Sequence, residues 1–225
     1  MIACHIASLP ERSECLKKTV SSVYGQVNEI HITLNGYTEV PKWLLALELH
    51  SNHPTIHYDI LDNALGDSAK FLHCWEKPAT CLILDDDLYA SPHYVPYMID
   101  GLRRHGGAVS LHGKCYAIRP IQHFKRNFTS NYRCLGSVAE DVRVDVIGTG
   151  CLAFDNTQVK FNESLFEQRN MADVLFSRLC WQQGVPMTVL KHDIGIIRYM
   201  PQTNTIWRNT HDDRIQTEII NSFLK

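Results

Sequence analysis

The sequence predicts an α/β fold in which a mostly parallel central sheet carries helices on both faces. Short apolar runs alternate with helix-type patterns through the first 105 residues, and this alternation is typical of βαβ units. The run at residues 81–85 is hydrophobic until its last position, as expected for a strand that is buried on both faces. No repeat or low-complexity linker interrupts the 225 residues. We therefore expect a single domain (1–225), with an α/β half at residues 1–113 and a mixed half at residues 114–225.

The first half repeats a strand-then-helix order four times. The first helix places Leu16, Val20 and Val23 at helical spacing. Pro41 opens the second helix at a position where proline is tolerated, and two glycines at residues 106–107 end the fourth. The strands are expected at residues 2–7, 29–34, 55–61 and 81–85, and the helices at residues 16–24, 41–49, 67–75 and 91–105.

The second half has a less regular order. Residues 114–142 are polar, aromatic and irregular, and residues 142–155 indicate two strand pieces around a Gly-Thr-Gly turn. An amphipathic helix follows, which Gly184 and Pro186 end. The other elements are expected to be strands at residues 108–113 and 187–190, and helices at residues 171–183 and 212–224.

The composition argues against several classes of protein. A net charge of −2 gives no basic surface for nucleic acid or for an acidic membrane, and no apolar run approaches the roughly 20 residues of a membrane span. The first residues lack the basic and apolar regions of a signal peptide. The eight cysteines are scattered and form no C-x-x-C pair, which argues against a zinc site. We therefore expect a reduced, cytoplasmic protein.

Three adjacent aspartates stand where the strand at residues 81–85 ends. In open α/β sheets, ligands bind at the carboxyl ends of the strands. Side chains two residues apart share a face of an extended segment, so Asp85 and Asp87 can converge while Asp86 points elsewhere. Two converging carboxylates repel each other unless a cation lies between them, and oxygen ligands suit Mg²⁺ or Mn²⁺. The alternative is a solvated turn or a cluster that caps the next helix.

Three further segments can contact a ligand at the same edge of the sheet. A polar loop, SLPERSECLKK, follows the first strand, where a nucleotide base and ribose would need one. Lys70, after the third strand, could reach a phosphate or pair with Asp67 at the surface. The turn at residues 148–150 could approach a ligand closely, because glycine has no side chain; a plain hairpin turn would have the same sequence.

Together these segments resemble the glycosyltransferases of the GT-A fold, in particular small family 2-like members of bacterial and phage type. The resemblance covers most of the chain. It rests on ASLPERSECLKKTVSSVYGQVNEIHITLNGY, GDSAKF, LILDDDLYASPHYV, DVIGTGCLAF and NMADVLFSRLCWQQGVPMTVLKH. It implies a Rossmann-like GT-A fold, a nucleoside-diphosphate sugar as donor, and Mn²⁺ or Mg²⁺ as cofactor.

The resemblance also assigns roles to individual residues. Asp87 matches the principal metal ligand of the DxD motif, and Asp85 matches a contact to the metal or the ribose. His192 lies where some of these enzymes place a late histidine ligand of the metal, and Asp173 occupies the place of the acidic pair that supplies the catalytic base. The residues expected to contact the nucleotide sugar are Ser8, Pro10, Arg12, Asp67, Lys70, Asp85, Asp86, Gly148, Thr149 and Gly150.

Two departures from the family pattern limit these expectations. Ala172 replaces the glutamate of the acidic pair, so Asp173 would act alone, at a helix N-terminus whose dipole favours the ionised carboxylate. A helix cap is the structural alternative for Asp173. The QxxRW motif of processive synthases is absent, which argues against a polymerising enzyme.

The implied reaction moves a sugar, with inversion, to a hydroxyl of a carbohydrate or lipid-linked acceptor, as in polysaccharide biosynthesis. A modified nucleic acid base is a less favoured acceptor. A metal-dependent nucleotidyltransferase and a sugar-binding protein without catalysis are the rival classes; the first lacks its glycine-rich activation loop here. Acceptor contacts are expected from Tyr116, Arg119, Phe124, Arg126, Phe128, Tyr132 and Arg133.

Overall fold

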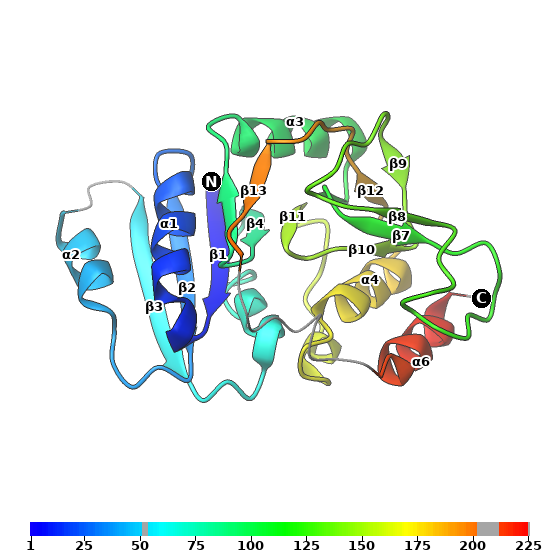
Figure 1. The fold of residues 1–225 in the computed structure, drawn as a ribbon, viewed down its shortest axis with the longest axis horizontal. Coiled ribbons are helices and arrows are strands. Elements are labelled where there is room, and N and C mark those ends of the chain that lie inside the picture. Colours follow the sequence, from blue (N-terminus) through cyan, green and yellow to red (C-terminus); the bar gives the residue numbers. More distant parts are fainter. Residues whose placement is uncertain (51–53, 202–211, 225) are drawn as a thin grey trace.

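A computed structural model describes residues 1–50, 54–201 and 212–224. An eight-stranded sheet crosses the whole molecule in the order β3-β2-β1-β4-β11-β6-β12-β9 (Figure 1). Six of these strands run in one direction, and β11 and β9 run against them. The predicted class, α/β with a mostly parallel sheet, is confirmed.

The strands of the first half form one continuous parallel set. Strand β1 pairs with β2 on one side and with β4 on the other, and β2 pairs with β3. The carboxyl ends of all four strands therefore meet at one edge of the sheet. Their bounds are Ile2–Ser8 for β1, Glu29–Asn35 for β2, Thr55–Leu61 for β3 and Thr80–Leu84 for β4.

Helices cover both faces of the sheet, as the sequence predicts. One face packs against α1, α2 and α3 through a cluster that includes Leu16, Leu44 and Met98. The other face packs against η2, α4 and α6 through a cluster that includes Phe154 and Phe176. Figure 1 shows α4 and α6 beside the second half of the sheet. The bounds are Ser13–Val23 for α1, Lys42–His50 for α2, Gly66–Phe71 for η2, Tyr94–His105 for α3, Ala172–Gln182 for α4 and Arg214–Phe223 for α6.

The second half completes the main sheet and adds two small sheets. Strand β11 lies antiparallel between β4 and β6, and so joins the two halves. One small sheet has the order β10-β7-β8, and the other pairs β13 with β5. The bounds are Leu88–Ala90 for β5, Ala108–Ser110 for β6, Gly113–Cys115 for β7, Ser130–Tyr132 for β8, Val142–Arg143 for β9, Val146–Ile147 for β10, Cys151–Asp155 for β11, Met187–Val189 for β12 and Ile197–Tyr199 for β13; two 3₁₀ turns are η1, Pro10–Arg12, and η3, Glu163–Phe166.

Two predicted elements differ in the structure. The helix expected at residues 67–75 is the 3₁₀ helix η2, in which residues 68–71 are all buried. The strand expected at residues 108–113 ends at Ser110, because Gly113 pairs with β10 and β8 in the neighbouring sheet.

None of the helices in the described ranges combines the length and the apolar character that crossing a membrane requires.

Candidate active site

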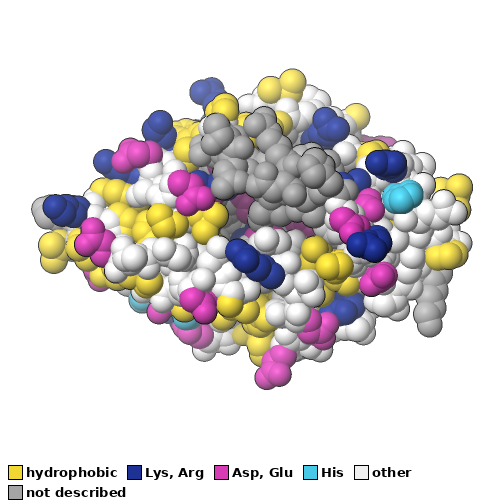
Figure 2. Space-filling view, turned by 60° about the horizontal axis from the view of Figure 1, so that its bottom comes forward, with side chains coloured by type: hydrophobic (Ala, Val, Ile, Leu, Met, Phe, Trp, Pro, Cys, Tyr) yellow, Lys and Arg dark blue, Asp and Glu magenta, His cyan; other side chains and the backbone are white. Residues whose placement is uncertain are grey.

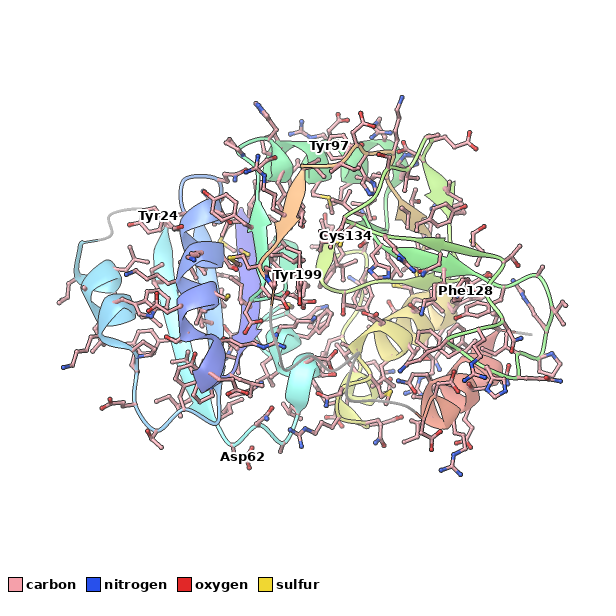
Figure 3. All side chains as sticks on the ribbon, in the orientation of Figure 1. Tyr24, Asp62, Tyr97, Phe128, Cys134 and Tyr199 are labelled. Atoms are coloured by element: carbon pink, nitrogen blue, oxygen red, sulfur yellow. The ribbon has the colours of Figure 1, made fainter. Side chains whose placement is uncertain are left out.

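A pocket of about 670 Å³ opens where β1 and β4 end and where β11 and α4 begin. Cys134 and Tyr199, which line it, are labelled near the middle of the molecule in Figure 3. The pocket brings together eleven of the residues selected from the sequence: Ser8, Arg12, Asp67, Lys70, Asp85, Asp86, Asp87, Gly148, Thr149, Gly150 and Asp173.

Asp86 is hydrogen-bonded to the loop that follows β1. Its carboxylate accepts a hydrogen bond of 2.6 Å from the Ser8 hydroxyl and one of 2.8 Å from Arg12 Nη1. The Thr19 hydroxyl donates to the Asp86 carbonyl oxygen at 2.9 Å. Asp86 is 3% exposed, so these contacts fix the first loop and the start of α1 against the end of β4.

Asp85 faces a buried cation. Lys70 Nζ donates to Asp85 Oδ1 at 2.7 Å, with the lysine side chain buried and the Asp85 side chain 44% exposed. Burial alone would lower the pKa of Lys70, but the carboxylates of Asp85 and Asp67 outweigh it and raise that pKa. Lys70 is therefore a fixed ammonium group, and the rest of the Asp85 carboxylate is open to the pocket.

The pKa of Asp87 is raised by its burial and by the charges of the two carboxylates beside it in the chain. Burial and the charges of Asp85 and Asp86 raise its pKa to about 7, while Arg12, with Nη1 3.4 Å from Asp87 Oδ2, lowers it. A divalent cation next to Asp85 and Asp87 would relieve this repulsion, and both residues supply the oxygen ligands that Mg²⁺ and Mn²⁺ prefer. The donor set therefore fits the predicted metal.

The Gly-Thr-Gly turn before β11 leaves room for Asp85. A Cβ atom at Gly150 would lie 2.4 Å from Asp85 Oδ2, and one at Gly148 would lie 2.8 Å from the Cβ atom of His112. The Asp85 N–H also donates to the Gly150 carbonyl oxygen at 2.9 Å. The absence of a side chain at residue 150 is therefore a geometric requirement of the pocket.

Asp173 lies in the first turn of α4. It accepts hydrogen bonds from Thr149 in the Gly-Thr-Gly turn before β11. Both the backbone N–H and the hydroxyl of Thr149 donate to Asp173 Oδ1, each at 2.7 Å. In the described residues, every hydrogen bond recorded for this carboxylate falls on Oδ1.

Asp67 is more deeply buried than a surface ion pair would be. Burial raises its pKa to about 7, although the charge of Lys70 opposes the shift. Its backbone N–H donates to Asn170 Oδ1 at 3.2 Å, and the preceding Gly66 has a φ of +58°. This left-handed conformation favours glycine and lets the chain pass against Asn170.

Pro10 and His192 are not among the residues that line the pocket in the described part of the chain. Pro10 is exposed in η1. His192 is buried, with Nδ1 2.7 Å from the Leu190 carbonyl oxygen and Nε2 3.2 Å from the Arg133 carbonyl oxygen. Among the described residues, His192 therefore does not join Asp85 and Asp87, the other predicted metal ligands, in the pocket.

The pocket also contains residues that sequence reasoning missed. His112 and Lys114 follow β6, whose carboxyl end lies at the same edge as that of β4, and this placement was the available signal. Lys114 is buried, with Nζ 3.6 Å from the centre of the Phe124 ring, and burial lowers its pKa to about 8. Of the expected acceptor contacts only Phe124 lines the pocket among the described residues, since Tyr116 is buried in the core and Arg119 pairs with Asp145.

Comparison with known proteins supports the fold. No family model and no curated protein matches this chain. Among solved structures, the crystal structure of residues 1–349 of TarS from S. aureus is similar, with a TM-score of 0.55 at 12% sequence identity. The match covers 86% of this chain and 58% of that one, so this chain spans less than two thirds of that structure. At this identity the likeness supports the fold alone, a Rossmann-like α/β fold with a mostly parallel central sheet.

Proposed function

We propose that this protein is a metal-dependent glycosyltransferase that moves a sugar from a nucleoside-diphosphate sugar to an acceptor hydroxyl. The observation that carries the proposal is the pocket itself. It combines two carboxylates that suit a divalent ion, Asp85 and Asp87, with two cations, Arg12 and Lys70, and with a separate carboxylate, Asp173. A binding protein would not need this last group.

The donor would be held at the carboxyl ends of β1 and β4. Ser8, Arg12 and Asp86 form the wall where the base and ribose would bind. Asp85 and Asp87 would hold Mn²⁺ or Mg²⁺, which when bound supplies positive charge to the leaving diphosphate. Lys70 is a second fixed positive charge beside Asp85.

Asp173 would act as the general base. Thr149 donates two hydrogen bonds to one carboxylate oxygen of Asp173, and Asp173 lines the pocket. A carboxylate that takes the proton from the acceptor hydroxyl as the sugar is transferred would give an inverting reaction.

The acceptor is proposed to be a hydroxyl of a carbohydrate or lipid-linked glycan. Phe124, Leu135 and Tyr199 line the pocket beside the polar groups and offer apolar surface to a sugar ring. A cytoplasmic location, as the sequence predicts, is part of the proposal.

A product assay tests this proposal and separates it from its rival. Purified protein is incubated with Mn²⁺, a panel of nucleotide sugars, and sugar or lipid-linked glycan acceptors. Release of a nucleoside diphosphate together with a glycosylated acceptor is expected, and Asp87→Asn should abolish both. A parallel incubation with nucleoside triphosphates and sugar phosphates tests the rival class. Release of pyrophosphate there, with no glycosylated acceptor formed from any nucleotide sugar, would identify a nucleotidyltransferase and contradict the proposal.

A further inference from the structure

Four histidines gather on the sheet outside the pocket. His5, His31 and His57 occupy paired positions on β1, β2 and β3. Their rings stack in sequence, with centroid distances of 4.7 Å and 4.5 Å. The ring of His73, which follows η2, stacks on His31 at 5.7 Å. The pairing register therefore builds a row of imidazoles from three strands that are far apart in the sequence.

The outer end of this row has the donor set of a metal site. One ligand atom from each of Glu29, His31 and His57 lies within 4.8 Å of the others, and Glu29 Oε2 is 3.3 Å from His31 Nε2. We propose that these three residues bind a divalent transition metal of the class that prefers imidazole, with Zn²⁺ as the first candidate.

The distances fit such an ion. Bonds of 2.0–2.2 Å in a tetrahedral zinc site place neighbouring ligand atoms roughly 3.4 Å apart. Glu29 and His31 already have this separation. His57 is exposed, so its ring can turn toward them without displacing the core.

The surroundings of the three ligands favour a cation. A hollow of about 370 Å³ beside His31 and His57 is also lined by Glu48, Asp59 and Glu76, with Lys77 as a cation among the described lining residues. Lys77 Nζ pairs with Glu29 Oε1 at 2.6 Å. Figure 2 shows histidine surface next to acidic side chains at the lower left edge of the molecule.

A second group, His5 with Cys74 and Cys81, is a poorer site. Its ligand atoms also lie within 4.8 Å of one another, but all three residues are buried. The solvent-accessible group is therefore the one to which we assign the ion.

A metal at this site would link β2 to β3. β3 is the edge strand of the main sheet, and exposed edges are the part of a sheet that proteins protect by covering or charge. The inference does not depend on the proposed transfer reaction, because none of the three ligands lines the pocket near Asp85.

Zinc titration in the Asp87→Asn variant tests the inference, since that substitution weakens competing binding at the aspartates. Calorimetry with ZnCl₂ is expected to give about one equivalent of saturable binding and a raised melting temperature. His57→Ala and Glu29→Gln, each added to this variant, should weaken binding at least tenfold, since even the loss of an outer-shell partner costs 10- to 100-fold. His93→Ala removes an exposed histidine at the start of α3 and should leave binding unchanged.

Three results would overturn the inference. The first is an absence of saturable zinc binding by the Asp87→Asn protein. The second is binding that neither His57→Ala nor Glu29→Gln weakens, measured in variants whose circular dichroism matches the parent. The third is binding that survives His57→Ala and is lost in Cys81→Ser, which would place the ion in the buried group.

Discussion

The three aspartates at the end of β4 differ in their partners although they are adjacent in the chain. Alternation along an extended segment predicts that Asp86 points away from Asp85 and Asp87. In the structure residues 86–87 form a turn, and Arg12 Nη1 contacts both Asp86 and Asp87, at 2.8 Å and 3.4 Å. The partner of Asp85 was harder to predict. Lys70 pairs with Asp85, whereas the sequence pointed to a phosphate or to Asp67, because only the sheet shows which strand ends are neighbours.

The raised pKa of Asp87 predicts how stability depends on pH. Its pKa is about 7 in the folded protein against 3.8 as a free side chain, so between these values the folded state binds more protons, and stability falls as pH rises. Asp87→Asn removes this pH-dependent contribution to stability. From pH 6 to pH 8 without metal, the stability of the wild type should fall by about 1 kcal/mol relative to Asp87→Asn.

Urea unfolding of both proteins at the two pH values measures this difference, and the contributions of the histidines and of Asp67 cancel in it. A constant difference in the free energy of unfolding between wild type and variant would contradict the pKa assigned to Asp87.

The role of Asp173 predicts a separation of binding from turnover. Asp173→Asn keeps the shape of the side chain but cannot accept the acceptor proton, so turnover should fall by about 10²- to 10⁴-fold. Donor affinity, measured by calorimetry, should stay within a few-fold of the wild type. Thr149→Val, which removes one of the two hydrogen bonds to Asp173 Oδ1, should cause a smaller loss. Unchanged turnover in Asp173→Asn would exclude it as the base.

At the scale of elements, the turn between β10 and β11 controls access to Asp85. A Cβ atom at Gly150 would lie 2.4 Å from Asp85 Oδ2, while one at Gly25 would meet nothing within 4 Å. Gly150→Ala is therefore expected to weaken metal-dependent donor binding at least tenfold with little change in melting temperature. Gly25→Ala is the matched control and should bind the donor normally. Equal donor affinity in the two variants would show that the turn does not position Asp85.

The elements of the first half were predictable because their signals are local. Alternation, helical spacing and the turn residues placed β1, β2, β3 and α3 within a few residues of their observed ends. The segment at residues 66–71 was not predictable in the same way. It is a 3₁₀ helix in which residues 68–71 are all buried, and the sequence does not show which surface covers them.

For the whole molecule, β11 joins two hydrophobic clusters on opposite faces of one sheet. We predict that the chain unfolds as one domain. Leu16→Ala in α1 and Leu179→Ala in α4 remove fully buried side chains from different clusters, and each should cost about 2–5 kcal/mol. Circular dichroism and tryptophan fluorescence should report one coincident transition in both variants. Two transitions, each shifted by only one substitution, would show two independent domains.

Site residues that come directly after the carboxyl ends of strands were predictable from the sequence. Those that long-range packing brings to the pocket were less predictable. Asp85, Asp87, Lys70 and Asp173 were selected from the sequence, and the pocket brings them together. His192 was selected by its position in the chain, but in the fold its ring faces two backbone carbonyl groups. Arg169 and Tyr199 line the pocket without a local pattern that marks them.

The most direct test is whether metal and nucleotide sugar bind together at the aspartates. Thermal unfolding is followed with a panel of nucleotide sugars, each with and without Mn²⁺, for the wild type and for Asp87→Ala. At least one nucleotide sugar should raise the melting temperature of the wild type only when Mn²⁺ is present, by mass action on the folded state, and Asp87→Ala should abolish the shift. Stabilisation that persists in Asp87→Ala, or no stabilisation by any nucleotide sugar with Mn²⁺, would contradict the assignment of this pocket as a glycosyltransferase site.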